Sequence, residues 1–348
     1  MQVLSTLSHL LCLWAPFATA AYTLKDDYGT GFTFFDQFSF FTGADPTNGF
    51  VKYVDRGTAQ NTGLISAEGT YMGVDHTNVA GDGRPSVRIT SNKSYNQGLF
   101  ILDLAHMPGS VCGTWPAFWL LGPDWPNNGE IDVIEGVNDQ SVNQFALHTS
   151  DSCTINNSGF SGQLLTSNCY VKAAGQANNA GCGIKDTSAQ SYGNGFNSAG
   201  GGVYATEWTD QKIDIWFFPR SGIPGDISSG NPNPSGWGTP VARFQGACNI
   251  NSHFKGLQII FDTTFCGDWA GNVWGQSSCA SKGTCRDFVA NNPAEFKESY
   301  WSVNSLKVYQ GGTSNAPKAN ATAAATATTH EKKPGTSPRP SFLRYRRK

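Results

Sequence analysis

The chain has 348 residues, of which 14% are charged, 12% are aromatic and 40 are glycine. An average domain carries about 25% charged residues, so this composition disfavours long, charged surface helices. A formal net charge of −2 gives no reason to expect a nucleic-acid partner.

The first 20 residues are predicted to form a secretory signal peptide. An apolar stretch covers residues 10–15, and the segment ends in Ala18-Thr19-Ala20, a small-residue cleavage pattern, although no Lys or Arg precedes the stretch. This apolar stretch is too short for a membrane span, which needs about 20 apolar residues. We therefore expect no membrane partner, and a protein that is secreted, extracellular or associated with the cell wall.

Residues 21–310 are predicted to form one all-β domain. Short apolar or alternating runs recur along it, separated by Gly, Pro and Asn, and no extended run places helix formers at 3.6-residue spacing. The runs cover residues 32–41, 86–90, 99–104, 143–149, 212–218, 257–261 and 302–309. Many short strands of this kind are typical of an antiparallel β-sandwich or a barrel.

The run at residues 129–136 differs from the others because it carries three carboxylates, Glu130, Asp132 and Glu135. Burying an unpaired ionised carboxylate is costly, so the cluster indicates chemistry rather than folding. On a regular strand Glu130 and Asp132 share one face and Glu135 lies on the other, and a helix separates them too. An extra residue at Val133 or Ile134, forming a β-bulge, would return Glu135 to the face of the other two.

Two carboxylates on one face can hydrolyse a glycosidic bond. A separation of about 5 to 5.5 Å suits a retaining enzyme, and about 6.5 to 9.5 Å an inverting one. The long side chains of Glu130 and Glu135 can lean together, so we expect them to be the catalytic pair, with Asp132 polarising both. Neighbouring negative charges raise the pKa of whichever carboxyl ionises last, which keeps it protonated as a general acid.

The segment Glu-Ile-Asp-Val-Ile-Glu resembles the signature of glycoside hydrolase family 16, in the form with an extra residue that is typical of laminarinase-like endo-β-1,3-glucanases. Further segments similar to the fungal laminarinase branch begin at Gly98, His106, Gly113, Trp125, Glu207, Ile215 and Tyr300, so the resemblance covers residues 22–310. It implies a β-jelly-roll (concanavalin-like) sandwich. It also implies Glu130 as nucleophile, Glu135 as acid/base and Asp132 as assisting carboxylate.

The function that this resemblance implies is that of a retaining endo-1,3(4)-β-glucanase. It would hydrolyse internal β-1,3 bonds, and β-1,4 bonds beside them, in laminarin-type and mixed-linkage glucans. We expect a monomer with a β-glucan as its partner and with no cofactor and no bound metal. Transglycosylation, in which a sugar hydroxyl replaces water, is an alternative that uses the same glutamates. A non-catalytic glucan-binding lectin is a second alternative, although a pure binder has no use for the paired glutamates.

Aromatic side chains are the expected sugar platforms, because the C–H faces of sugar rings pack on indole. Trp115, Trp119 and Trp125 precede the acidic strand, and Trp269 and Trp274 lie in the Gly-rich segment 265–275, which we expect to be a cleft loop. Any one of these tryptophans could instead belong to the core of the sandwich.

His148 lies in the run that follows the acidic strand, at a spacing similar to that of a His in the laminarinase branch. We expect it to lie beside Glu135 and to orient it, and the alternative is a structural histidine. Glu207, Asp262 and Asp268 are expected to be solvated or turn residues with no function.

Removal of Cys12 with the signal peptide leaves eight cysteines, enough for four disulfides. Their spacing leaves the pairing open, although Cys153, Cys169 and Cys182 cluster in a long region that would benefit from tethering. Zinc binding is disfavoured because the chain has no Cys-x-x-Cys pair and only six histidines. Sequons at Asn92, Asn156 and Asn320 permit N-glycosylation.

Residues 311–348 are predicted to be a disordered tail rich in Ala, Thr, Ser and Pro. The tail holds eight Lys and Arg against one acidic residue, whereas the rest of the chain is acidic. A solvated tail is one interpretation, and adhesion to an acidic wall polymer is the other.

Overall fold

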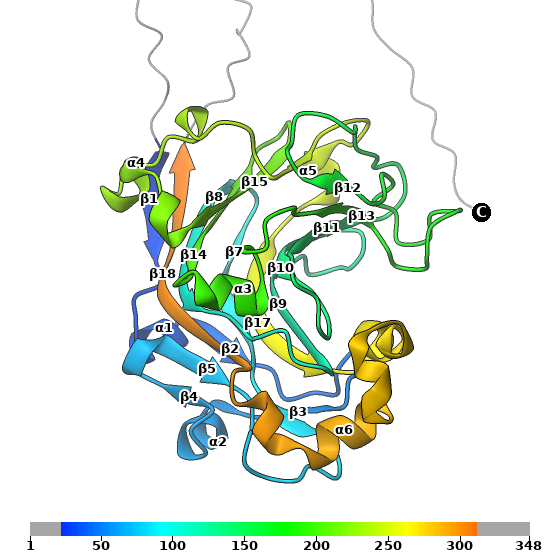
Figure 1. Cartoon of the computed structure of the whole chain (residues 1–348). Coiled ribbons are helices and arrows are strands. Elements are labelled where there is room, and N and C mark those ends of the chain that lie inside the picture. The colour runs from blue at the N-terminus through cyan, green and yellow to red at the C-terminus, as the bar shows by residue number, and fades with distance from the viewer. Residues whose placement is uncertain (1–21, 312–348) are drawn as a thin grey trace, which may run out of the picture. The chain divides into compact units, whose positions relative to one another are not determined.

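The computed structural model describes residues 22–311, which form two large β-sheets packed face to face (Figure 1). The predicted signal peptide at residues 1–20, the predicted tail from residue 312 onward and the sequon at Asn320 lie outside the described residues. Across residues 22–311, the longest α-helix has seven residues, and no helix is long and apolar enough to cross a bilayer.

The first sheet has the strand order β16-β15-β14-β8-β18-β5-β4, and β1 also pairs with β18. All of its neighbours run antiparallel. Its strands are β1 (Tyr22–Asp27), β4 (Ile65–Ser66), β5 (Tyr71–Gly73), β8 (Gly98–His106), β14 (Gly202–Trp208), β15 (Ile213–Pro219), β16 (Ala242–Phe244) and β18 (Tyr300–Gly311).

The second sheet has the order β12-β13-β11-β10-β9-β17-β7-β2 and is also antiparallel. Its strands are β2 (Phe38–Phe40), β7 (Arg88–Tyr95), β9 (Thr114–Leu121), β10 (Glu130–Glu135), β11 (Gln144–His148), β12 (Gln163–Leu164), β13 (Cys182–Lys185) and β17 (Leu257–Phe265). A separate parallel pair joins β3 (Val51–Tyr53) and β6 (Arg84–Ser86).

The apolar core lies between the two sheets and takes its side chains from both. Ile131, Val133 and Ile134 of β10 are fully buried there, and so are Leu102 and Leu104 of β8. Side chains alternate between the two faces of a strand, so the remaining side chains of β10 lie on the face that is turned away from this core. The predicted antiparallel β-sandwich is confirmed.

The helices are short and lie in the connections. They are α1 (Phe32–Phe35), α2 (Arg56–Asn61), α3 (Gly193–Ser198), α4 (Gly225–Ser228), α5 (Ile250–His253) and α6 (Cys285–Asn291). The strand predicted at residues 32–41 is wrong in its first half, where α1 precedes β2. Gly29 and Gly31 have φ values of 69° and 60°, which turn the chain here, and one helical turn then buries both Phe34 and Phe35 in the core. The other six predicted runs contain strands.

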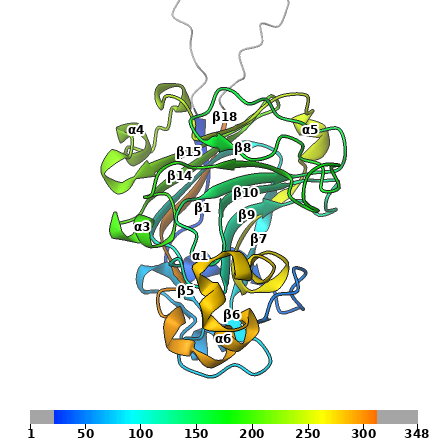
Figure 2. The same cartoon turned by 45° about the vertical axis from the view of Figure 1, so that its right-hand side comes forward.

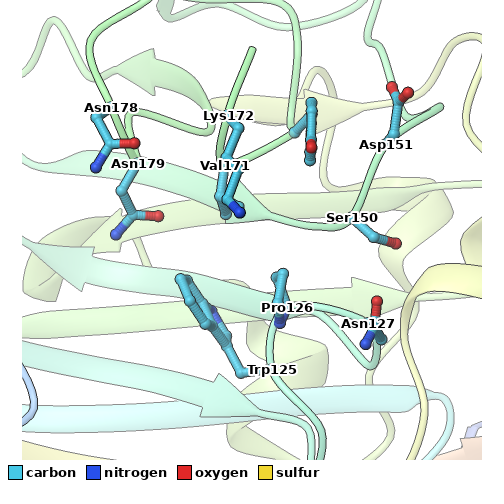
Figure 3. Close-up of a pocket in the computed structure, with 10 residues that line it drawn as sticks. Trp125, Pro126, Asn127, Ser150, Asp151, Val171, Lys172, Asn178 and Asn179 are labelled. Atoms are coloured by element: carbon cyan, nitrogen blue, oxygen red, sulfur yellow. The ribbon is translucent and has the colours of Figure 1, made fainter.

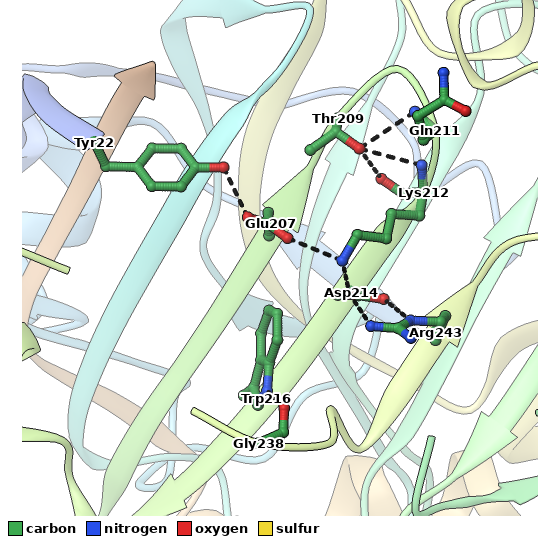
Figure 4. Close-up of polar contacts among 9 residues, drawn as sticks. All are labelled: Tyr22, Glu207, Thr209, Gln211, Lys212, Asp214, Trp216, Gly238 and Arg243. Carbon is green, nitrogen blue, oxygen red and sulfur yellow. Dashed lines mark hydrogen bonds and ion pairs between the residues drawn. The ribbon is translucent and has the colours of Figure 1, made fainter. Parts of the chain in front are cut away.

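The outer face of the first sheet carries a polar network that joins four strands (Figure 4). Glu207 of β14 accepts a hydrogen bond of 2.9 Å from the Tyr22 hydroxyl of β1 and lies 3.2 Å from Lys212 Nζ. Lys212 also contacts Asp214 of β15, which is fully buried and accepts two hydrogen bonds of 2.7 Å from Arg243 of β16. The Glu207 side chain is 13% exposed, so the expectation that it is a solvated residue is wrong.

Four disulfides use all eight predicted cysteines. They are Cys112–Cys279, Cys153–Cys248, Cys169–Cys182 and Cys266–Cys285. The first and last hold the segment around α6, which gathers at one end of the strands (Figure 2). The other two tether the long segment between β11 and β13, as the sequence led us to expect.

Candidate active site

Strand β10 contains the predicted β-bulge. Between Asp132 and Glu135 it has two residues, Val133 and Ile134, whereas the facing stretch of β11 has one, Phe145. On the other side, Asp132 pairs with Trp119 of β9 and Ile134 pairs with Phe118, which leaves Val133 as the extra residue. Strands β9 and β10 lie side by side in both views (Figures 1 and 2).

The bulge gathers the three carboxylates on the face of β10 that is turned away from the core. Asp132 and Glu135 lie opposite Trp119 and Ala117 of β9, which are two residues apart and so point to one side of the sheet. Glu130 is two residues before Asp132 and lies on that side as well. Without the extra residue, Glu135 would point into the core.

The two glutamates are held in an environment that favours their protonated forms. Burial raises the pKa of Glu130 to about 8, with the charge of Asp132 as the second cause, whereas His148 and a hydrogen bond from Trp125 lower it. Burial, followed by the charge of Asp132, raises the pKa of Glu135 well above its ordinary value. At neutral pH at least one of the two therefore carries a proton, as a general acid requires.

His148 lies opposite Glu130 on β11, and its Nε2 is 3.3 Å from Asp132 Oδ2. Its Nδ1 lies 3.0 Å from Asn179 Oδ1, which fixes the other side of the ring. Burial lowers the pKa of His148, but the charge of Glu130, the hydrogen bond to Asp132 and the charges of Asp132 and Glu135 together raise it to about 10. The imidazolium thus compensates part of the negative charge of the site.

The expected contact between His148 and Glu135 is therefore not what the structure shows. The register of β10 with β11 places Gln144, rather than His148, opposite Glu135. His148 instead contacts Asp132 and lies at the Glu130 end of the strand. The reason is the antiparallel direction of β11: its start, Gln144, faces Glu135, so His148 four residues later faces the other end of β10.

Two of the predicted tryptophans lie at the Glu135 end of the site. Trp115 Nε1 donates a hydrogen bond of 2.8 Å to Glu135 Oε1, which opposes the rise in the pKa of that carboxyl. The Trp269 ring packs edge-on against Trp115, with centroids 5.7 Å apart. Trp269 lies in the π-helical turn Gly267–Gly271 that follows β17.

Trp125 lies at the opposite end of the site and is 43% exposed. It precedes a cis peptide bond to Pro126 in the loop between β9 and β10. Both residues line a cavity of about 620 Å³ (Figure 3). The cavity is also lined by Asn127, Ser150, Asp151, Tyr170, Val171, Lys172, Asn178 and Asn179. Because Asn179 contacts His148, the cavity adjoins the carboxylate cluster.

The remaining two tryptophans differ in accessibility. Trp119 is partly buried, and the Arg88 guanidinium lies 5.0 Å from the centre of its ring. Trp274 is buried, and its Nε1 donates to the Gly283 carbonyl at 2.8 Å within the small apolar cluster around α6. Trp274 therefore belongs to the core, and its expected role as a sugar platform is wrong. A Gly-rich loop beside a site can thus still place an aromatic side chain in the apolar core instead of in the site.

Asp262 of β17 is buried rather than solvated as expected. Its Oδ2 lies 3.4 Å from the Tyr53 hydroxyl and 3.9 Å from Arg88 Nη1. Burial raises the pKa of Asp262 to about 7, and the charge of Arg88 opposes that rise. Since Asp262 pairs with Ala117 of β9, it lies on the same face of the sheet as Glu135. Asp268 is exposed, as expected.

Glu130, Asp132 and His148 have the spacing of a possible metal site, because one ligand atom from each lies within 4.8 Å of the others. The same atoms also form the contact between the carboxylate of Asp132 and the imidazole of His148. Hydrolysis by two carboxylates requires no ion. The expectation of no bound metal stays a prediction.

Sequence reasoning missed two asparagines of the site, Asn143 and Asn179. Asn143 is fully buried beside the bulge, and Asn179 lies in the loop tethered by Cys169–Cys182. Asn143 ends a polar stretch and Asn179 lies in a stretch rich in Asn and Gly, and in such stretches an asparagine normally indicates a turn. For Asp262 a signal was present, since its polar side chain alternates with apolar residues along β17.

Residues 38–309 match the family described as the XgeA-like catalytic domain of glycoside hydrolase family 16. The chain is 51% identical over 312 residues to an endo-1,3(4)-β-glucanase of Arthroderma benhamiae, covering 87% of this chain and 68% of that protein. It is 47% identical to the endo-1,3(4)-β-glucanase XgeA of Emericella nidulans, covering 85% of this chain and 49% of that protein. The chain thus spans about half of the latter relative.

Two solved structures superpose with a TM-score of 0.77, each covering 83% of this chain and 100% of its own. One, at 49% identity, is an elongating family 16 β-1,3-glucosyltransferase. The other, at 44% identity, is laminarinase 16A of Phanerochaete chrysosporium with 6-O-glucosyl-laminaritriose in both donor and acceptor sites.

Proposed function

Since the chain belongs to the XgeA-like group of glycoside hydrolase family 16, we propose that it is a retaining endo-1,3(4)-β-glucanase. The proposed substrates are laminarin-type and mixed-linkage glucans, cut at internal β-1,3 bonds and at β-1,4 bonds beside them. The relatives named as endo-1,3(4)-β-glucanases support this assignment, and so does the bound oligosaccharide of the P. chrysosporium laminarinase.

In the first step the Glu130 carboxylate attacks the anomeric carbon while Glu135 gives its proton to the leaving glycosidic oxygen. The C–O bond to the leaving sugar breaks, and a covalent glycosyl-enzyme forms. In the second step the ionised Glu135 takes a proton from water, which attacks the anomeric carbon and releases Glu130. Burial raises the pKa of both glutamates, which favours the protonated acid at Glu135, and the positive charge of His148 opposes that rise at Glu130, where the attack needs the ionised form.

The observation that carries this proposal is the bulge in β10. It brings an ionisable group at position 135 to the face that already holds Glu130 and Asp132, and Trp115 hydrogen-bonds that group from the neighbouring strand. A purely structural strand would instead direct residue 135 into the apolar core. Two glutamates with Asp132 between them form the donor and nucleophile set that retention needs.

The test uses alanine variants of the two glutamates. Glu130→Ala and Glu135→Ala are each expected to reduce reducing-end release from laminarin by several orders of magnitude, and Glu68→Ala, at an exposed site, should keep wild-type activity. ¹H NMR of the first products of the wild-type enzyme should show the β-anomer before mutarotation. Early α-anomer would refute the retaining mechanism, and an active Glu130→Ala variant would refute the assigned nucleophile.

Secretion and a monomeric state remain part of the proposal. Four disulfides support folding in an oxidising compartment. Expression from a eukaryotic host with residues 1–20 present or deleted, followed by mass spectrometry of the medium, would test it. A full-length protein retained in the cell with residues 1–20 attached would contradict secretion, and size-exclusion chromatography with light scattering would test the monomer.

Transglycosylation is a second candidate activity, favoured by the 49% identity to an elongating β-1,3-glucosyltransferase. In that reaction a sugar hydroxyl replaces water in the second step, and the residues at 130 and 135 keep their roles. Sizing of products from a short β-1,3-oligosaccharide over a range of concentrations separates the two outcomes. Products longer than the substrate would indicate transfer, and exclusively shorter ones would indicate hydrolysis. Binding of laminarin without either product would favour a lectin instead.

A further inference from the structure

A β-bulge removes backbone groups from the hydrogen-bond ladder of a sheet. In β10 the affected segment is Val133–Glu135, where Val133 and Ile134 are fully buried. A buried backbone N–H or C=O without a partner is costly, so the bulge must have other partners.

Those partners come from one side chain, that of Asn143. Its Oδ1 accepts a hydrogen bond of 2.9 Å from the Glu135 N–H, and its Nδ2 donates one of 2.8 Å to the Val133 carbonyl. The Asn143 side chain is fully buried. One amide thus supplies the acceptor and the donor that a backbone peptide unit of β11 would otherwise supply.

Asn143 is itself held in place from the other side of the strand. Its backbone N–H donates to Ser191 Oγ at 3.0 Å, and its carbonyl accepts from the Asp186 N–H at 2.9 Å. Ser191 Oγ in turn donates to the Ser188 carbonyl at 2.7 Å. The segment that follows β13 therefore fixes the position of the amide, and the amide fixes the bulge.

We propose that Asn143 is the positioning residue for Glu135, and that it sets the direction of the proton-donating side chain without contacting the sugar. This inference rests on the proposed role of Glu135 as acid/base. The physical reason is the two-residue period of a strand. If the amide is lost, pairing of β10 with β11 without the extra residue becomes competitive, and that register turns residue 135 towards the core.

A residue that positions Glu135 affects only reactions that need the Glu135 proton, whereas a residue that supports the fold affects every reaction of the enzyme. Laminarin has a poor leaving group that needs a proton from Glu135. An aryl β-laminaribioside with a 2,4-dinitrophenolate leaving group needs none, and its glycosylation step reports on Glu130 alone. Asn143→Ala should therefore reduce kcat/KM on laminarin by about 10²-fold, the cost of a misplacement of about 1 Å, with little change in the dinitrophenolate burst rate.

The matched control is Asn197, which also holds a backbone N–H and a backbone C=O, both of Met107, at 3.0 and 2.9 Å. Asn197→Ala removes an equivalent pair of bonds that does not involve β10, so its activities on the two substrates should change together. Asn143→Asp keeps the acceptor for the Glu135 N–H, and because burial favours the protonated carboxyl, its O–H can donate to the Val133 carbonyl in place of the amide. It should fold and show a smaller loss on laminarin, so it provides the test if Asn143→Ala does not fold.

Glu135→Ala serves as the reference. If Glu135→Ala keeps its laminarin activity, the proposed function fails, whatever Asn143 does. If Glu135→Ala discriminates between the two substrates but the Asn143 variants lose both activities equally, as Asn197→Ala is expected to, the positioning role is overturned. Selective loss on laminarin in the Asn143 variants, with the burst retained, supports it.

Discussion

Replacing Trp115 with Phe should raise the pKa of Glu135, the proposed acid/base. The substitution removes the indole N–H that donates to Glu135 Oε1 at 2.8 Å and keeps an aromatic ring in the same place. A hydrogen-bond donor favours the ionised form of a carboxylate, so its presence lowers the pKa and its loss raises it. The general acid would then stay protonated to a higher pH.

The size of the effect follows from the strength of the lost bond. A hydrogen bond to a charged group contributes about 1.5 to 3 kcal/mol, and one pKa unit corresponds to about 1.4 kcal/mol. The alkaline limb of kcat/KM should therefore move up by about 1 to 2 pH units. Trp115 also packs against Trp269, and the phenyl ring keeps part of that contact, so KM should change less than the pH profile.

The assay is the pH dependence of kcat/KM on laminarin, measured for the wild type, Trp115→Phe and Trp216→Phe. Trp216 is the control because its Nε1 also makes a hydrogen bond, to the Gly238 carbonyl at 3.1 Å, on the first sheet (Figure 4). Its substitution should leave the alkaline limb in place. A limb in Trp115→Phe that stays put or moves to lower pH would refute the reasoning.

Three further predictions address other parts of the domain. Trp125→Ala should raise KM for laminarin by about 10-fold with little loss of stability. Trp274→Ala should lower the free energy of unfolding by about 3 to 5 kcal/mol. A destabilised Trp125→Ala with an unchanged KM, or a stable Trp274→Ala with a raised KM, would contradict the assignment of Trp125 to the site and Trp274 to the core. Asp262 has a folded pKa of about 7 against about 3.9 unfolded, so the native state binds more protons and stability falls as pH rises between these values. Urea unfolding of Asp262→Asn should show a slope against pH that is flatter by up to about 1.4 kcal/mol per unit, and an unchanged slope would exclude Asp262 as a source. Replacing both Cys169 and Cys182 with serine removes a disulfide that joins residues 13 positions apart, and it should lower the free energy of unfolding, measured by thermal unfolding, by about 3 kcal/mol. KM should also rise, because residues of this loop line the cavity. A variant with wild-type stability would show that the remaining contacts of that loop suffice.

The bulge in β10 was predictable because the positions of its three carboxylates are incompatible with a regular strand or helix. Three carboxylates at positions 130, 132 and 135 cannot share one face of a regular strand or helix, and the bulge is the local structure that reconciles them. Apolar or alternating runs likewise predicted β7, β8, β11, β15, β17 and β18. Segment 32–41 failed because a run of aromatic residues is compatible with either a strand or one helical turn, and burial of Phe34 and Phe35 decided between them.

The partners of the carboxylates were harder to predict because they depend on register. His148 was expected beside Glu135 and lies across from Glu130, since β11 runs antiparallel to β10 and its first residue, Gln144, is the one that faces Glu135. No sequence motif identifies Asn143. Its role follows from the structure, in which the Val133 carbonyl and the Glu135 N–H need hydrogen-bond partners and the Asn143 side chain supplies both. Which tryptophans are exposed depends equally on tertiary packing, which local sequence does not contain.

The pairing of β1 with β18 has a practical consequence. Tyr22 lies opposite Gly311, so the two ends of the described domain meet in the first sheet, whereas the proposed catalytic carboxylates belong to the second. A short peptide could connect these ends, and new termini could be opened in an exposed turn such as 228–231. Such a circularly permuted enzyme, or one grafted to a support through either end, would present its glucan-facing side without obstruction.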